Sequence, residues 1–374
     1  MDPLIQEAKR AALDVLLHNA SGPFEGLPRT AGWGYPEPYT RDLLISSLGI
    51  FASGNQDLLN SLRRVLETLA GNQSPRGQIP STVHDPENRG ASDTTPLFLL
   101  VLGLYRRFTK DATFLQGAAV KALQWMDYQT IDDRDLVGQQ PTSDWRDEQW
   151  VLGHGLYVNA LVHGYLRLLG LEDRANAFRI AANRVDGRGF ATTDQPTYSE
   201  WFYKVFRDSR CDVLGNSLAI LTGLADPGRA RDMVAWIEAQ CVELRLSGDL
   251  ALDLPPCLFP FMKPGDPDWQ ARYETYNLPG NYHNGGVWPF VCGFYVAALV
   301  AAGEQRLAEA TLRALTVLVQ RSRKLPATHP GAFGFNEWFR AQDGAPAGED
   351  WQTWSASMYL YAAASVESGK ALYL

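Results

Sequence analysis

The sequence has 374 residues, of which 45% are hydrophobic and 20% are charged, and its formal net charge is −8. This composition suits a globular enzyme with a large core, and the negative charge argues against nucleic acid or an anionic membrane surface as partner. The four cysteines are far apart and form no CxxC pair, so we expect neither a disulfide framework nor a structural zinc site.

Apolar residues recur at helical intervals through most of the chain. The first helix is predicted directly at the N-terminus, with no basic segment leading into a long apolar run, so we expect a cytoplasmic protein without a membrane segment. Short strands are predicted only near 78–84 and 251–260. The predicted helices cover residues 3–19, 41–53, 56–70, 95–108, 112–128, 151–169, 173–184, 212–224, 228–244, 286–303, 305–321 and 351–367.

The pairing of these helices predicts an all-α fold, a closed (α/α)6 barrel with six inner and six outer helices. An open α-solenoid is the alternative, but the sequence has no repeat of fixed period. No linker interrupts the chain, so we predict one catalytic domain over residues 1–374. Five of the six long loops fall after every second helix, which predicts that the loops gather at one mouth of the barrel. These loops are near 20–40, 71–94, 129–150, 185–211, 245–285 and 322–350.

Two loops place carboxylates among aromatic residues. Residues 142–150 read TSDWRDEQW, just before a helix predicted to start near Val151. Asp144 or Asp147 could cap that helix, or could act as a carboxylic acid whose pKa is raised beside the Trp145 indole. Glu337 lies in the segment GFNEWF, where it could form a surface salt bridge or act as a general base that activates water.

Other loop residues suit a sugar-binding pocket, because aromatic faces cover the C–H face of a sugar and polar groups bind its hydroxyls. Arg41 and Asp42 form an adjacent cation and anion that could bind two hydroxyls, or could cap a helix and pair with each other. Asp93 follows a serine at a predicted helix start and could be only a cap. The further candidates for pocket walls and hydroxyl contacts are Tyr39, His283, Asn284, Trp288, Gln352 and Trp354.

Several of these segments resemble those of the neutral and alkaline invertases, glycoside hydrolase family 100, and more distantly those of amylo-α-1,6-glucosidases and other six-hairpin glycosidases. Residues 282–289 (YHNGGVWP) are similar to the family's YHNGGxWP motif. Further similarities are Glu337-Trp338-Phe339 followed by a glycine turn and residues 351–354 (WQTW), residues 212–216 (DVLGN), and residues 39–42 (YTRD). Asp93 falls where the family has VDSG.

The resemblance implies inverting hydrolysis with an aspartic acid as proton donor and a glutamate as base. The base corresponds to Glu337, and spacing back from Gly153 assigns the acid to Asp147, with Asp144 as the alternative. The chain is shorter than the family's members, and their glycine-rich loop before the FTLGN segment is not recognisable in it. These differences concern the leaving-group side of the pocket.

We therefore predict an inverting glycoside hydrolase that cleaves the α-glucosidic bond of a small sugar, with sucrose as the first candidate. Another small α-glucoside or an α-1,6 branch is the alternative substrate. A sugar 2-epimerase, which needs a base histidine, and a non-catalytic carbohydrate-binding barrel are the alternatives of another class. Acid, base and positioning suffice for hydrolysis, so no cofactor or metal is expected. The expected partner is a small carbohydrate, and the sequence leaves a homo-oligomer open.

Overall fold

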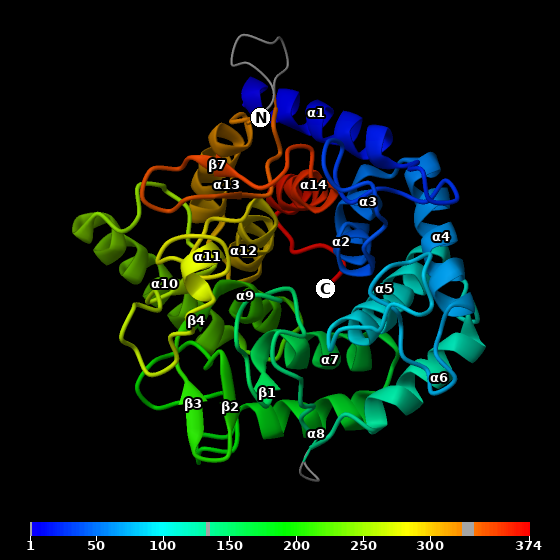
Figure 1. Ribbon diagram of the computed structural model, residues 1–374, viewed down its shortest axis with the longest axis horizontal. Coiled ribbons are helices and arrows are strands. Elements are labelled where there is room, and N and C mark those ends of the chain that lie inside the picture. The colour runs from blue at the N-terminus through cyan, green and yellow to red at the C-terminus, as the bar shows by residue number, and fades with distance from the viewer. Residues whose placement is uncertain (1, 132–134, 324–332) are drawn as a thin grey trace.

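Two concentric rings of helices form the molecule in the computed structural model, which describes residues 2–131, 135–323 and 333–374 (Figure 1). The outer ring contains α1 (Pro3–Asn19), α4 (Gln56–Gly71), α6 (Gln116–Asp127), α8 (Glu172–Ala182), α10 (Pro227–Ser247) and α13 (Gln305–Val319). The inner ring contains α2 (Thr40–Ile45) with α3 (Ser47–Ser53), α5 (Thr94–Thr109), α7 (Leu156–Leu168), α9 (Val213–Leu221), α12 (Pro289–Ala301) and α14 (Thr353–Ser368). Each inner helix contacts the next, and α14 closes the ring against α2 and α3. The predicted (α/α)6 barrel is confirmed.

The two rings differ in where their apolar residues lie. In α12 every residue from Pro289 to Val300 is buried, because this helix packs against α9 and α14 on its flanks and α13 behind. In α4 the buried positions include Leu58, Leu62, Leu66 and Leu69, which recur at helical spacing on one face. An apolar stripe therefore marks an outer helix, and apolar residues all round mark an inner one.

The connections also differ between the two ends of the barrel. Short turns such as residues 169–171 and 302–304 lead from an inner to an outer helix, whereas the long loops lead inward. The long loops carry short elements: β1 (His154–Gly155), β2 (Trp201–Tyr203) and β3 (Phe206–Asp208) in one antiparallel sheet, β4 (Cys211–Asp212) with β5 (Leu258–Phe259), β6 (Trp338–Phe339) with β7 (Pro346–Ala347), and the helix α11 (Tyr273–Tyr276). All these loops approach the N-terminal ends of the inner helices, which form the mouth.

Several predicted boundaries are wrong. The helix predicted over 41–53 is two helices that meet at Ser46, and the helix predicted from Val151 begins only at Leu156. Before Leu156 the chain is extended, because His154 and Gly155 pair with β2. Residues 112–115 form turns, and no strand forms at 78–84, where Thr82 makes an isolated bridge to Tyr39. In the stretch 251–260 only Leu258–Phe259 is a strand.

Parts of the predicted loops 129–150 and 322–350, residues 132–134 and 324–332, lie outside the described residues. The expectation of one domain over residues 1–374 stays a prediction. Within the described ranges, none of the helices combines the length and the apolar composition that crossing a membrane requires.

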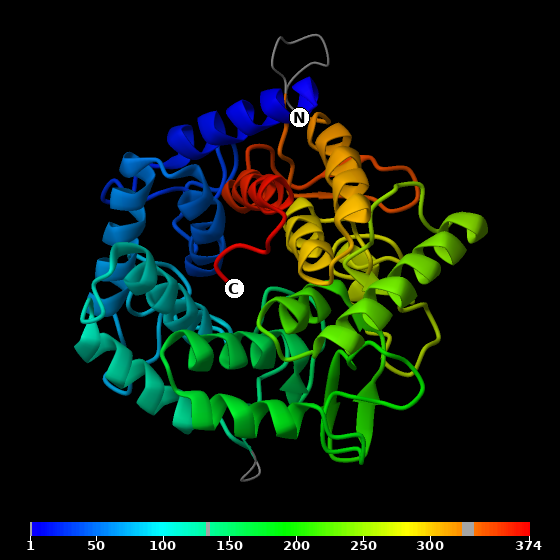
Figure 2. The same ribbon diagram turned by 180° about the vertical axis from the view of Figure 1, so that it is seen from behind.

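Residues 370–374 cross the middle of the ring in both views (Figure 2). The ring of Tyr373 packs against Phe51 near the end of α3 and against Tyr361 in α14. The hydroxyl of Tyr361 donates a hydrogen bond of 2.9 Å to the carbonyl of Leu372. The segment therefore lies at the C-terminal ends of α3 and α14, away from the mouth.

Candidate active site

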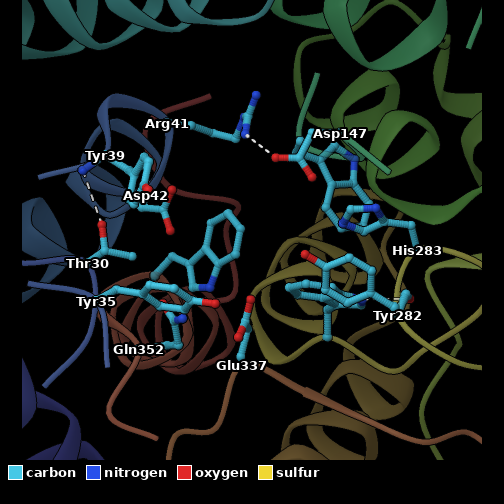
Figure 3. Close-up of a pocket in the computed structure, with 13 residues that line it drawn as sticks. Thr30, Tyr35, Tyr39, Arg41, Asp42, Asp147, Tyr282, His283, Glu337 and Gln352 are labelled. Carbon is cyan, nitrogen blue, oxygen red and sulfur yellow. Dashed lines mark hydrogen bonds and ion pairs between the residues drawn. The ribbon is translucent and has the colours of Figure 1, made fainter. Parts of the chain in front are cut away.

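A pocket of about 180 Å³ lies where the inner helices begin (Figure 3). Its residues come from the first turns of α2 and α14 and from the loops before α2, α7, α12 and α14, so four of the inward loops meet there. Of the residues predicted from the sequence, those that line the pocket are Tyr39, Arg41, Asp42, Trp145, Asp147, His283, Trp288, Glu337, Gln352 and Trp354.

Three predicted residues, Asp93, Asp144 and Asn284, do not line this pocket. Asn284 is fully buried, and its side chain is occupied by the backbone. It accepts a hydrogen bond from the amide of Met262 and donates to the carbonyls of Met262 and Asn277, at 2.8 to 2.9 Å. The prediction of a hydroxyl contact is wrong for Asn284, which instead shapes the loop that carries His283.

Asp93 lies buried behind the pocket wall. It stands at the start of α5 but makes no side-chain cap, and its carboxylate accepts a hydrogen bond of 2.5 Å from Nε of Arg41. The Tyr157 hydroxyl donates to the same carboxylate oxygen at 3.3 Å. The capping alternative is therefore wrong. Asp93 holds Arg41, whose guanidinium lies 4.0 Å from the carboxylate of Asp147.

Asp144 belongs to a second buried group, which we call the Arg146 cluster: Asp144, Arg146, Glu200 and Asp212. Arg146 lies 2.5 Å from Glu200 and 3.4 Å from both aspartates, and all four side chains are at most 1% exposed. Asp144 accepts hydrogen bonds from the Arg146 amide and from Gln139, so it does not cap α7. Burial raises the pKa of Glu200 well above its usual value. The cluster fixes the loop that carries Asp147.

Glu337 lies at the opposite side of the pocket from Asp147 (Figure 3). Its side chain is 7% exposed and makes no ion pair with the described residues, so the surface salt bridge considered from the sequence is wrong. The Glu349 amide donates to its Oε2 at 3.1 Å. Gly348 has φ +72°, and a Cβ atom there would lie 2.1 Å from Oε2, so only glycine lets the backbone pass this close to the carboxyl.

Three carboxyls face the pocket from different sides, and each has a raised pKa (Figure 3). Desolvation by the surrounding protein raises the pKa of Asp42 to about 7, of Asp147 to about 6 and of Glu337 to about 8. Repulsion from neighbouring carboxylates adds to each increase, while the charge of Arg41 opposes it at Asp42 and Asp147. The side chain of Asp147 is 58% exposed toward the mouth. A pocket that holds protonated and ionised carboxyls at neutral pH can perform acid–base chemistry.

Aromatic rings form one wall of the pocket. The ring of His283 stacks on Tyr282 at 3.9 Å and lies 5.5 Å from Trp288, and Trp145 packs edge-on to Trp288. The Nε1 atoms of Trp145 and Trp354 and Oε1 of Gln352 are buried without a hydrogen-bond partner among the described residues. Each unpaired polar group costs about 1–3 kcal/mol. A ligand with several hydroxyls would satisfy them.

Sequence reasoning missed three residues of the lining, Thr30, Tyr35 and Tyr282. The pKa of Tyr35 is raised to about 12, and the largest cause is the negative charge of Glu337. The Tyr35 hydroxyl therefore lies near the candidate base. Tyr282 has φ +44°, and such strained backbone in a bulky residue is typical of functional sites. The signals in the sequence were the aromatic composition of loop 20–40 and the place of Tyr282 at the start of the YHNGG motif.

Comparison with known proteins adds to this geometry. The model of the family described as alkaline and neutral invertase matches residues 197–368. This part of the chain is similar to that family. The match includes Glu337, the YHNGGVWP segment and the WQTW segment, so the resemblance seen in the motifs is confirmed over this range.

The curated relatives are similar over part of the chain only. A probable alkaline/neutral invertase F of Arabidopsis thaliana is 30% identical over 158 residues, which cover 41% of this chain and 28% of the relative. Cytosolic invertase 1 of Oryza sativa subsp. japonica is 28% identical over 43% of this chain and 26% of its own length. The chain thus spans just over a quarter of the length of these relatives.

Solved structures share the fold over nearly the whole chain. A GH63 mannosylglycerate hydrolase from Thermus thermophilus, in complex with Tris and D-glycerate, has a TM-score of 0.68 and 16% identity. The alignment covers 94% of this chain and 99% of that one. A glycosidase in complex with glucose has a TM-score of 0.64 and 16% identity, with 98% and 99% covered. At this identity the comparison shows the barrel fold alone.

Proposed function

We propose that the protein hydrolyses the α-glycosidic bond of a small sugar with inversion at the anomeric carbon. The observation that carries the proposal is the pair of carboxyls, Asp147 and Glu337, on opposite sides of one aromatic-walled pocket (Figure 3). Inverting glycosidases need one carboxyl on each face of the sugar, about 6.5–9.5 Å apart, so that a water molecule fits beside the base. The similarity of residues 197–368 to the invertases supports the same chemistry.

In this mechanism Asp147 donates its proton to the glycosidic oxygen as the bond to the anomeric carbon breaks. A water molecule attacks that carbon from the opposite face, and Glu337 takes the water's proton. The Glu349 amide holds Oε2 of Glu337, which leaves Oε1 to accept the proton. Asp147 is left ionised, beside the charge of Arg41, and Glu337 is left protonated.

The pKa values set the fraction of molecules that are ready to react. The reactive form has Asp147 protonated and Glu337 ionised, whereas pKa values of about 6 and about 8 favour the reverse arrangement in the empty pocket. The reactive form is therefore the minor one of the two singly protonated forms of the empty pocket. Its population is greatest between the two pKa values, so the rate is expected to peak near pH 7 and to fall on both sides.

The remaining pocket residues would bind the sugar. Asp42 is ionised or protonated near neutrality and could accept or donate hydrogen bonds to hydroxyls. The unpaired indole nitrogens and the Gln352 oxygen supply further donors and an acceptor, while the rings of Trp145 and Trp288 cover the apolar face. With a volume below the usual range for ligand pockets, this cavity suits a single sugar ring.

The first substrate to test is sucrose, because the curated relatives are named invertases. Other small α-glycosides are the alternative, because the leaving-group side differs from the family motifs. The epimerase alternative is disfavoured, because that chemistry needs a base histidine. Among the described residues, His283 is the one histidine that lines the pocket, and three carboxyls line the same pocket. The cytoplasmic location and a homo-oligomer stay predictions.

The test is hydrolysis of a panel of α-glycosides, with sucrose first, in which NMR follows the anomer released. We expect the β-anomer first, and a loss of at least about 10³-fold in kcat for Glu337→Gln and for Asp147→Asn. Glu274→Gln, an exposed glutamate outside the pocket, is the matched control and should keep full activity. Release of the α-anomer, or full activity of Glu337→Gln, would contradict the mechanism. Silence across the panel would contradict the function.

A further inference from the structure

A second cavity, of about 300 Å³, adjoins the candidate active site. Both cavities are lined by Tyr39, Arg41 and Asp147, so these residues form the boundary between them. The rest of the second cavity comes from residues 81–94, which lead into α5, and from residues 142 and 143.

The position of Asp147 fixes what the second cavity would hold. If the sugar ring occupies the first cavity, the acid must lie within hydrogen-bond reach of the glycosidic oxygen. That oxygen then stands at the boundary, and the group attached to its other side extends into the second cavity. This step rests on the proposed function.

The charges in the second cavity favour a negative leaving group. Arg41 is already paired with Asp93 and lies beside Asp147, so its charge is offset. Arg89 lines the cavity, is exposed, and has no ion-pair partner in the described chain. Because Asp147 is neutral when it is ready to donate its proton, the uncompensated charge in this cavity is that of Arg89.

The other contacts disfavour a second sugar ring. Tyr39 is the one aromatic residue among the described lining, and it is shared with the first cavity, so a ring would find no platform of its own. The hydroxyl of Thr94 donates to the carbonyl of Ile79, and that of Ser81 donates to the carbonyl of Arg89. The second of these bonds holds the backbone of Arg89 in place and leaves its guanidinium available.

We propose that the second cavity binds an anionic leaving group, the carboxylate of a small hydroxy acid, and that Arg89 is the residue that recognises it. The planar guanidinium donates two parallel hydrogen bonds to a carboxylate. A phosphate dianion fits less well, because one free arginine leaves part of its charge uncompensated beside Asp147. The natural substrate would then be an α-glycoside of a hydroxy acid.

The test compares two substrates that differ in one group, the α-glucoside of glyceric acid and the α-glucoside of glycerol. For the unmodified protein we expect kcat/KM to be at least about tenfold higher for the acid. Arg89→Gln should bring this ratio close to one, and Arg89→Lys should keep part of it. Arg76→Gln, an exposed arginine that lines neither cavity, should keep the full ratio.

A binding measurement separates this inference from the proposed function. Calorimetry with D-glycerate, glycerol and inorganic phosphate needs no turnover. Binding of D-glycerate over the other two, lost in Arg89→Gln, would support the site even if no glycoside were cleaved. Equal kcat/KM for the two glucosides with no selective binding of glycerate would overturn the inference while hydrolysis itself stood. Tighter binding of phosphate would overturn the choice of a carboxylate.

Discussion

Two regions of this molecule each bring together three carboxyls and an arginine, and they differ in access. In the pocket, Asp42, Asp147 and Glu337 face open space, and Arg41, which acts on Asp42 and Asp147, is held from behind by Asp93. In the Arg146 cluster the carboxyls converge on the guanidinium itself, and the group is sealed from solvent. The first arrangement leaves carboxyls available to a ligand, whereas the second uses them to fix a loop.

A carboxyl that is paired directly with a buried cation serves to fix the structure, whereas a carboxyl without such a pairing stays available to a ligand. Glu200 and Glu337 both have raised pKa values because of burial. Glu200 is nevertheless hydrogen-bonded to Arg146 and Gln149, while Glu337 has one amide donor and an open face. A raised pKa alone therefore does not identify a catalytic group, and three substitutions test the distinction.

The largest effect is expected for Arg146→Met. This substitution keeps the side-chain volume but leaves three buried carboxyls without a cation, and such a loss typically costs about 3–5 kcal/mol of unfolding free energy. Urea denaturation measures it. Arg63→Met, at an exposed pair with Glu67 on α4, is the matched control and should cost under about 0.5 kcal/mol. Equal costs for the two variants would mean that the Arg146 cluster does not stabilise the fold.

For Glu337→Gln at high pH we expect a medium change in the free energy of unfolding, and this change is an increase. The pKa of Glu337 is about 8 in the folded protein and close to 4.5 when unfolded, so between these values the folded state binds more protons and loses stability as pH rises. Glutamine carries no charge to bury. The variant should be stabilised by about 1–3 kcal/mol at pH 8 and by much less at pH 5.

Urea denaturation of Glu337→Gln at both pH values checks the size and the sign. Glu274→Gln, which changes an exposed glutamate, should show no such pH dependence. A variant that is destabilised at pH 8 would indicate that Glu337 makes favourable contacts as an anion.

The smallest effect is expected for Glu200→Gln. Glutamine keeps a side chain of the same shape with an oxygen that accepts from Arg146 and Gln149, and burial, which raises the pKa of Glu200, disfavours the charge that is lost. The cost should therefore stay under about 1 kcal/mol. Glu200→Ala, which removes the acceptor of Arg146 and leaves a cavity, should cost several times more. A loss of about 3 kcal/mol or more in the glutamine variant would show that Glu200 is ionised.

The barrel could be predicted because its helices carry their own signals. Apolar periodicity gave every helix of the two rings, and errors lie at helix starts and at Ser46, where the chain breaks between α2 and α3. The delayed start of α7 depends on pairing of His154 and Gly155 with β2, which lies some fifty residues further on. The local spacing of apolar residues carries no information about a strand partner that lies so far away in the sequence.

The sequence allowed the types of residue in the site to be predicted better than the directions in which their side chains point. The aromatic and carboxylate residues of the motifs do line one pocket, but Asp93, Asp144 and Asn284 have similar motif positions and point elsewhere. Asp93 meets Arg41 across fifty-two residues, and Asn284 is bonded to Met262 twenty-two residues away. Tyr35 was missed because its loop has no periodic pattern that places a side chain.

Residues 370–374, which cross the ring at the ends of α3 and α14, give the barrel a floor. The pocket lies at the other end, so the ring is shaped as a cup rather than a tunnel. A long polymer could not be threaded through such a shape and processed along its length. Under the proposed mechanism, both products leave by the mouth through which the substrate came.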